Sequence, residues 1–208
     1  MTKVKTKIFI AIPTIGNIRT ELAIFLLGLN RQIFDVIVSF TIGGGIAHNR
    51  NKLVEGFLKT DYEWFLFIDS DTVPPLNVLD MIKNGKDICS GVYHQFKGNK
   101  LSPLIFEKYQ DKYKFIQKDN KDNLIEVDGV GTGCLLIHRN VFNKMKKPYF
   151  EFLYDEIGLV KLSEDLNFCK KAQKAGFKIW VDKRMGASHH KTVDLLPVWT
   201  MLIDKNKK

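Results

Sequence analysis

Cysteine is scarce in this chain, and the spacing of the three that occur excludes two common uses of the residue. Cys89, Cys134 and Cys169 are odd in number, far apart and surrounded by apolar residues. They form no CxxC pair of the kind that binds zinc, and they do not make a disulfide framework. We therefore expect reduced thiols in the core of an intracellular protein.

Long apolar runs are also missing. No stretch approaches the roughly 20 apolar residues that a helix needs to cross a bilayer. The basic segment Met1–Lys7 and the apolar run Ile8–Ile12 superficially suggest a signal peptide, but the run is too short and Pro13 ends it. We interpret it as a first buried strand and expect a cytoplasmic protein. Near the C-terminus, Leu195–Ile203 is predicted to pack on the domain, and peripheral contact with a membrane is the alternative.

Acidic residues are outnumbered by basic ones. The 208 residues include 32 Lys and Arg against 23 Asp and Glu, which gives a net charge of +9. Such a surface attracts phosphates, nucleic acids and anionic membranes without distinguishing among them. Because the sequence contains no Arg-rich arm and no familiar nucleic-acid module, we expect a solvated basic surface and no specific nucleic-acid partner. The hydrophobic fraction of 45% indicates a folded chain and excludes a disordered one.

Apolar runs alternate with helical patterns through the first half of the chain. The runs expected to form strands are Ile8–Ile12, Val36–Phe40, Trp64–Ile68 and Asp87–Gly91. The segments expected to form helices are Asn17–Gln32, His48–Lys59 and Pro75–Lys83. Nearly continuous apolar strands indicate a sheet that helices cover on both faces, hence an α/β fold with parallel pairing.

Short strands are more frequent in the second half. Leu104–Phe106 and Tyr113–Gln117, joined through Asp111-Lys112, predict a small β-hairpin attached to the main sheet. The later elements are predicted as a strand at Gly133–Ile137, a helix at Val141–Lys146, a helix at Glu164–Ala175 and a strand at Lys178–Val181. Ser163 is expected to cap the second of these helices and Gly176 to end it.

The most specific feature is a buried strand that ends in two carboxylates, Trp64-Phe65-Leu66-Phe67-Ile68-Asp69-Ser70-Asp71. Ligands of open α/β sheets bind at the carboxyl ends of the strands. Two acids held there repel each other unless a cation lies between them, and a divalent ion that bridges diphosphate oxygens supplies this compensation. We predict that Asp69 and Asp71 bind a metal ion. The alternative is that Asp69 caps a turn and Asp71 is merely exposed.

Several motifs in a fixed order resemble the GT-A glycosyltransferases, particularly the broad family 2-like group. In chain order they are Ile12-Pro13-Thr14, Arg50-Asn51, Asp69-Ser70-Asp71, Gly131-Thr132-Gly133, Glu164-Asp165 and a late histidine. Their order is more specific than any single motif, and the resemblance runs from Ile8 to about Lys191. It implies a GT-A (Rossmann-like) α/β fold, with a mixed, mostly parallel sheet flanked by helices and a small β-hairpin extension.

The resemblance also implies a binding site for a nucleoside-diphosphate sugar. The residues predicted to bind the donor are Pro13, Thr14, Ile15, Gly16, Arg50, Asp69, Ser70, Gly131, Thr132, Gly133 and Lys191. Independently of it, Pro and Gly after a strand suit a tight turn, and alternating glycines let a ligand approach the backbone closely. The helix that starts after Gly43-Gly44-Gly45 offers N–H groups to an anion, although a flexible turn explains these glycines equally well.

Glu164-Asp165 lies where the resembling family has its general base, and we predict that Asp165 is the base with Glu164 beside it. An acceptor hydroxyl must lose its proton as the sugar arrives, and a hydrogen-bonded carboxylate can take that proton. The alternative is that both acids only stabilise the positive end of a helix dipole.

His189 and His190 fall where the family often supplies a histidine to the metal or to the donor phosphates. His189 is preferred because of its spacing from Asp182, and the choice stays open. Imidazole suits Mn²⁺ better than Mg²⁺, so Mn²⁺ is the predicted ion and Mg²⁺ the alternative. A loop histidine with no ligand is the other interpretation of the pair.

Together these motifs predict a metal-dependent glycosyltransferase that moves a sugar from a nucleoside-diphosphate sugar to a hydroxyl of an unidentified glycan, lipid or protein. Inversion is the simplest outcome, retention stays open, and the resemblance favours UDP-sugars over GDP-sugars. We expect one domain over residues 1–208, with a nucleotide-binding half at 1–91, an acceptor and catalytic half at 92–191 and a tail at 192–208.

Two other functions fit parts of the sequence. A sugar-phosphate nucleotidyltransferase would share the α/β plan and the metal carboxylates, but its early Gly-rich phosphate signature with a following Lys or Arg is missing here. A non-enzymatic basic protein that binds nucleic acid or a membrane would need the charge alone, and its binding would be strongly salt-sensitive.

Overall fold

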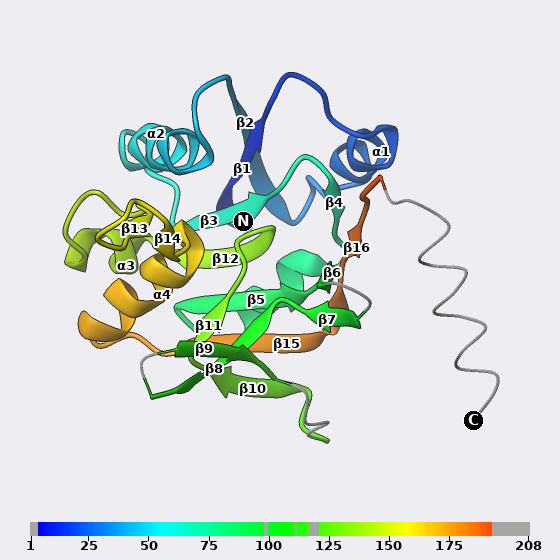
Figure 1. The fold of residues 1–208 in the computed structure, drawn as a ribbon. Helices are drawn as coiled ribbons and strands as arrows, with labels where there is room; N and C mark the ends of the chain where they lie inside the picture. Colours follow the sequence, from blue (N-terminus) through cyan, green and yellow to red (C-terminus); the bar gives the residue numbers. More distant parts are fainter. Residues whose placement is uncertain (1–3, 98–99, 111, 117–120, 193–208) are drawn as a thin grey trace, which may run out of the picture.

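Seven strands form one central mixed sheet in the computed structural model, which describes residues 4–97, 100–110, 112–116 and 121–192 (Figure 1). In spatial order they are β10 (Leu124–Val127), β15 (Ile179–Gly186), β5 (Ile88–Val92), β12 (Cys134–His138), β3 (Trp64–Ile68), β1 (Thr6–Thr14) and β2 (Phe34–Ile42). The mixed α/β sheet predicted from the sequence is confirmed. The carboxyl ends of β1 and β3 meet at one edge, because both strands and β2 run parallel.

Parallel pairs join β2, β1 and β3 at one end of the sheet. β15 is parallel to β5, but β12 runs antiparallel to both of its neighbours, β3 and β5, and β10 runs antiparallel to β15. Five of the seven strands, β2, β1, β3, β5 and β15, therefore run in one direction, which confirms the predicted mixed, mostly parallel sheet. The reversal of β12 could not be predicted, because a short apolar run such as Leu135-Leu136-Ile137 specifies burial on both faces but not the direction of the strand.

Helices cover both faces of the sheet. The helices α2 (Ile46–Leu58), α3 (Arg139–Lys144) and α4 (Glu164–Lys174) lie on one side, and α1 (Thr20–Leu27) lies on the other with the 3₁₀ helix η1 (Val78–Asn84) (Figure 1). Strand β1 shows why both sides are apolar. Phe9 and Ala11 belong to the core under α2, whereas Ile8, Ile10 and Ile12 belong to the core under α1, as the two-residue period of a strand requires.

The face of α2 that meets the sheet contains Arg50, Leu53, Val54 and Phe57, all of them buried. Their spacing of three and four residues places them on one side of a helix. Phe57 packs edge-on against the rings of neighbouring elements, with a ring-centroid distance of 5.1 Å to Phe65. One apolar stripe thus fixes the rotation of α2 about its axis, and it carries Arg50 inward with the apolar side chains.

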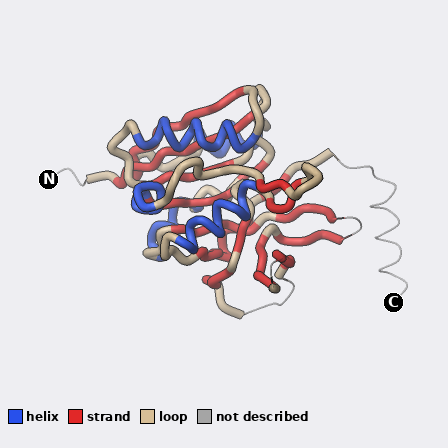
Figure 2. The backbone as a smooth tube through the Cα atoms, turned by 60° about the vertical axis from the view of Figure 1, so that its left-hand side comes forward, coloured by secondary structure: helices blue, strands red, loops and turns tan. Residues whose placement is uncertain are grey.

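Among the described residues, four smaller sheets accompany the central one. They are β11-β8-β9 (Gly129–Val130, Ile105–Tyr109 and Lys112–Phe115), β6-β7 (His94–Lys97 and Lys100–Pro103), β13-β14 (Leu153–Tyr154 and Val160–Leu162) and β16-β4 (Ser188–His189 and Thr72–Val73). Figure 2 shows the β6-β7 hairpin on the same side of the molecule as the last described residues of the chain. The predicted hairpin is confirmed in β8 and β9. It pairs with β11 instead of the main sheet, and Asp128 beside β11 accepts a hydrogen bond from the Lys108 backbone N–H (2.6 Å).

Two predicted helices are shorter than expected. The helix predicted over Asn17–Gln32 is α1 alone, because Gly28 occupies its C-cap and the residues before Thr20 are held in the loop that follows β1. The helix predicted over Pro75–Lys83 is the 3₁₀ helix η1. Its first hydrogen bond joins the Val78 N–H to the Pro75 carbonyl three residues earlier (3.0 Å), and Gly85 ends it in a left-handed conformation.

No helix within residues 4–97, 100–110, 112–116 and 121–192 is long and apolar enough to cross a bilayer. The segment Leu195–Ile203, with its predicted contact to the domain or to a membrane, lies outside the described residues.

A matched pair of leucines tests the assignment of the core. Leu53→Ala on α2 removes a side chain that is 2% exposed, and we expect it to lower the free energy of unfolding by about 2–5 kcal/mol through lost burial and a residual cavity. Leu27→Ala on α1 alters a side chain that is 86% exposed. This substitution should change the free energy of unfolding by less than about 0.5 kcal/mol. Urea unfolding followed by circular dichroism measures both, and equal losses would contradict the assignment.

Candidate functional site

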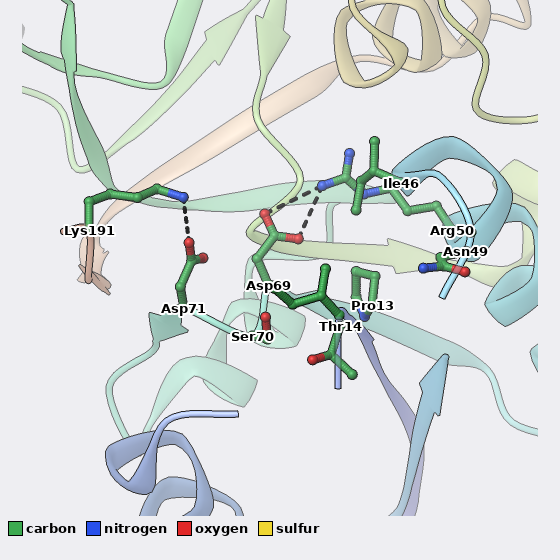
Figure 3. Close-up of a pocket in the computed structure, with 11 residues that line it drawn as sticks. Pro13, Thr14, Ile46, Asn49, Arg50, Asp69, Ser70, Asp71 and Lys191 are labelled. Carbon is green, nitrogen blue, oxygen red and sulfur yellow. Dashed lines mark hydrogen bonds and ion pairs between the residues drawn. The ribbon is translucent and has the colours of Figure 1, made fainter. Parts of the chain in front are cut away.

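The acidic residues after β3 lie beside the loop that follows β1. Both strands are parallel, so Asp69, Ser70 and Asp71 emerge at the same edge as Pro13 and Thr14. An open pocket lies there, as Figure 3 shows. Its lining residues are Pro13, Thr14, Ile15, Gly44, Ile46, Asn49, Arg50, Asp69, Ser70, Asp71 and Lys191. Seven of the residues predicted to bind the donor line this pocket; Gly16, Gly131, Thr132 and Gly133 do not.

The loop after β1 is held by the side chain of Thr14. Its hydroxyl donates to the Asn17 carbonyl (2.6 Å) and accepts from the Gly16 N–H (3.1 Å). Gly16 has a φ of 126°, which a residue with a side chain rarely adopts, so glycine is required at this turn. The loop places Ile15, 93% exposed, at the rim of the pocket.

Arg50 joins two motifs that are far apart in the sequence. One Nη of its buried guanidinium donates to the Glu164 carboxylate at the start of α4, and the other donates to Asp69 Oδ1 (3.1 Å). Burial alone would lower the pKa of Arg50, but the charges of Asp69 and Glu164 outweigh it and raise that pKa. Burial and the Asp165 carboxylate raise the pKa of Glu164, against the effect of Arg50. Arg50 therefore lines the pocket, while its hydrogen bonds go to protein carboxylates, and its contact with a donor stays a prediction.

A second charged group forms around Asp71. His189 Nε2 lies 3.5 Å from Asp71 Oδ1, and the Lys191 ammonium donates to Asp71 Oδ2. In Figure 3 the two carboxylates lie between two cations, with Lys191 beside Asp71 and Arg50 beside Asp69. Burial alone would raise the pKa of Asp71, but hydrogen bonds from His189 and Lys191 lower it to about 2. The Asp71 carboxylate is therefore ionised at neutral pH.

His189 is oriented by its other ring nitrogen. Nδ1 lies 2.7 Å from the His94 carbonyl, and the ring packs edge-on against Tyr93. Burial would lower the pKa of His189, but hydrogen bonds to Asp71 and to the His94 carbonyl raise it. If Nδ1 carries the proton, Nε2 of the neutral ring is free to bind a cation. His190 instead contributes its backbone N–H, which donates to the Asp71 carbonyl (2.8 Å).

Of the four predicted metal ligands, the structure brings Asp71 and His189 face to face. Asp69 is held by Arg50, and the contact of His190 with Asp71 is through the backbone. In the described parts of the chain, no group of three or more His, Cys, Asp or Glu side chains is arranged to hold a metal ion.

The predicted base lies on the first turn of α4. Asp165 Oδ1 accepts from the Leu166 N–H (2.7 Å) and from the Ser163 hydroxyl. Ser163 does occupy the N-cap position, but its hydroxyl holds Asp165 instead of capping the backbone, which corrects the predicted cap. Gly176 ends the helix with a φ of 89°, as predicted.

The glycine segment before β12 packs against Tyr93. A Cβ on Gly131 would lie 2.1 Å from Tyr93 Oη, and the Gly133 N–H donates to the same oxygen (2.8 Å). The Gly133 carbonyl accepts from the Asp69 N–H (3.2 Å). The close approach expected of these glycines is therefore made by a tyrosine. Tyr93 is itself buried, and the contact of Gly131, Thr132 and Gly133 with a donor stays a prediction.

The sequence reasoning missed two features of the site. Asn49 and Ile46 line the pocket from the first turn of α2, and neither belongs to a motif. The ion pairs of Arg50 were also missed, although a signal existed. Arg50 shares a helical face with Leu53, Val54 and Phe57, and a charged residue on an apolar face must find a partner.

The central mixed sheet, with helices on both faces and an acidic pair after β3, has the GT-A glycosyltransferase fold, which confirms the prediction. Three solved structures share it. A197 from STIV aligns with a TM-score of 0.62 at 22% identity, over 90% of this chain and 87% of that one. S. aureus TarS 1-349 in complex with UDP-GlcNAc gives 0.54 at 17% identity, over 90% and 60%. GalNAc-T7 with UDP, GalNAc and Mn²⁺ gives 0.50 at 10% identity, over 91% and 44%.

One curated protein is similar in sequence. Mannan polymerase complex subunit mnn9 of Schizosaccharomyces pombe is 26% identical over an alignment of 171 residues that covers 66% of this chain. The match spans 49% of that protein, so this chain corresponds to about half the length of its relative. No family model matches the chain.

Removing Arg50 tests whether its ion pairs stabilise the site. Arg50→Met leaves the carboxylates of Asp69 and Glu164 without their partner, and we expect it to lower the free energy of unfolding by about 3–5 kcal/mol. Adding Glu164→Gln to that variant should recover part of the loss, because one unpaired buried charge disappears. Arg19→Met breaks an exposed pair with Glu21 and should have almost no effect. Urea titrations compare the variants, and full stability of Arg50→Met would contradict this role.

Proposed function

We propose that this protein is a metal-dependent glycosyltransferase that moves a sugar from a nucleoside-diphosphate sugar to an acceptor hydroxyl. The observation that carries the proposal is the meeting of Asp71, His189 and Lys191 beside the pocket at the carboxyl end of β3. The GT-A fold supports it, since S. aureus TarS was solved with UDP-GlcNAc and GalNAc-T7 with UDP, GalNAc and Mn²⁺. The similarity to a mannan polymerase complex subunit supports a reaction on sugars.

The residues at Asp71 fit a divalent cation. A carboxylate oxygen and an imidazole nitrogen face each other, and the second ring nitrogen of His189 is tied to a backbone carbonyl, as is usual for metal-binding histidines. This mixed oxygen and nitrogen pair favours Mn²⁺ over Mg²⁺. Asp71 and His189 would hold the ion, which when bound neutralises charge on the diphosphate. Asp69, already bound to Arg50, would orient the donor next to them.

The transfer step needs a base and a leaving group. Asp165 takes the proton of the acceptor hydroxyl, whose oxygen forms a bond to the anomeric carbon. The bond between that carbon and the diphosphate oxygen breaks, and its electron pair leaves with the nucleoside diphosphate. Attack from the face opposite the leaving group inverts the anomeric carbon. The Ser163 hydroxyl and the Leu166 N–H hold Asp165 in place for this role.

The nucleotide end of the donor would lie along the loop after β1. Thr14 and Ile15 line the pocket, and a neighbouring pocket continues past Ile15 and Ser70 toward Glu21 of α1. UDP-sugars are the favoured donors, because both liganded neighbours with this fold hold uridine nucleotides. The acceptor is a hydroxyl of a glycan, a lipid or a protein.

Cleavage of a donor with water as acceptor tests the reaction class. The purified protein should release UDP or GDP slowly from one of a panel of UDP- and GDP-sugars, and only with Mn²⁺ present. Asp71→Asn should lower that rate about 100-fold or more, since a cation ligand supplies several kcal/mol of stabilisation to the leaving group. Asp80→Asn, in an exposed pair with Lys83, is the matched control and should keep the rate. Metal-independent cleavage, or an active Asp71→Asn, would refute the metal role.

A second variant tests Asp165 as the base. Asp165→Asn should keep the UDP affinity of the wild type, because Asp165 does not line the donor pocket. Donor cleavage by this variant should fall about 100-fold to 10,000-fold, the usual contribution of a positioned base. Isothermal titration with UDP and a UDP-release assay separate the two effects. An unchanged cleavage rate would remove Asp165 as the base.

A further inference from the structure

Backbone pairing holds Lys191 close to Asp71. The strands β16 and β4 pair Ser188 with Val73 and His189 with Thr72, and the His190 N–H donates to the Asp71 carbonyl. The segment before Lys191 is thus attached to the segment that contains Asp71. The Lys191 ammonium reaches Asp71 Oδ2 from a position 120 residues later in the chain (Figure 3).

The ammonium occupies the carboxylate that the cation would use. Asp71 Oδ1 faces His189, and Asp71 Oδ2 accepts from Lys191. A divalent ion on this carboxylate would stand within a few ångströms of the lysine charge, and like charges at that distance repel strongly in a partly buried site. Asp69 offers no substitute, because Arg50 already binds it. Lys191 and the cation therefore compete for Asp71.

Lys191 is also able to leave. Its side chain is 54% exposed, and its ammonium sits on a flexible four-carbon stem. Arg50, in contrast, is 5% exposed and bound on two sides. Lys191 lines the same pocket as Thr14 and Ser70, so a diphosphate bound there would offer its ammonium a more negative partner than a single carboxylate.

We propose that Lys191 is an internal cation that holds Asp71 until a nucleoside diphosphate draws it away, so that donor binding and divalent-cation binding are coupled. This inference rests on the proposed function, because it takes the ligand of the pocket to be a nucleoside diphosphate. Without the nucleotide, Lys191 keeps the cation affinity low. With it, Lys191 moves to the phosphates and frees Asp71 for the cation. By linkage, the cation must strengthen nucleotide binding by the same factor.

Binding measurements test the coupling without turnover. Mn²⁺ is titrated into the full chain with and without saturating UDP, and free Mn²⁺ is followed by electron paramagnetic resonance. We expect Lys191→Gln to bind Mn²⁺ alone about tenfold tighter than the wild type, because the competing charge is gone. UDP alone should bind to the Lys191→Gln variant about tenfold more weakly than to the wild type. The increase in Mn²⁺ affinity that UDP causes should also be smaller in this variant. Lys191→Arg keeps the charge and should behave like the wild type.

Lys174→Gln is the matched control, since it removes the same charge from an exposed residue in the last turn of α4. It should leave every affinity unchanged. Equal or weaker Mn²⁺ binding by Lys191→Gln would overturn the inference, and so would a wild type whose Mn²⁺ affinity UDP does not change. These outcomes are distinct from failure of the proposed function, which would appear as absence of donor cleavage in a protein whose Mn²⁺ and UDP affinities remain coupled.

Discussion

The buried guanidinium of Arg50 is the contact on which the arrangement of the site depends. A carboxylate is stable in a protein interior only with a partner, because desolvation strongly disfavours an unpaired charge. Arg50 partners two of them, Asp69 from the end of β3 and Glu164 from the start of α4. It thereby fixes α2, β3 and α4 relative to one another. Asp71 and Asp165 lie one or two residues after Asp69 and Glu164, so the ion pairs of Arg50 also help to position them.

The two charged groups of the site differ in burial, and this difference suits the roles proposed for them. The Arg50 group is buried and bound on two sides, so it serves as a rigid scaffold. The Asp71 group is partly exposed, and its lysine reaches it through a flexible stem. Tyr93 lies between the groups, in contact with the glycines before β12 and with the ring of His189. A rigid scaffold with one exchangeable partner can hold its geometry while its ligands change.

Much of the fold was predictable because strand burial and helical periodicity are local properties. The predicted strand Trp64–Ile68 matches β3, and the predicted start of α4 at Glu164 is correct. Strand direction was not predictable, since the apolar run of β12 is the same in either orientation. Within the site, motif order identified the pocket loop, the acidic pair and Lys191. The ion pair between Arg50 and Glu164 joins residues 114 positions apart, and no local pattern specifies which distant carboxylate a buried arginine meets.

The described C-terminal end of the chain has a practical consequence for handling this protein. Lys191 lines the pocket and Thr192 is the next residue, so a tag fused directly after Thr192 would begin beside a residue of the pocket. The start of β1 lies far from the pocket. Thr6 opens β1 at the far edge of the sheet, roughly 26 Å along the strand from Thr14, given about 3.3 Å per residue. A purification handle at the N-terminus therefore joins the domain at the end of β1 opposite the pocket.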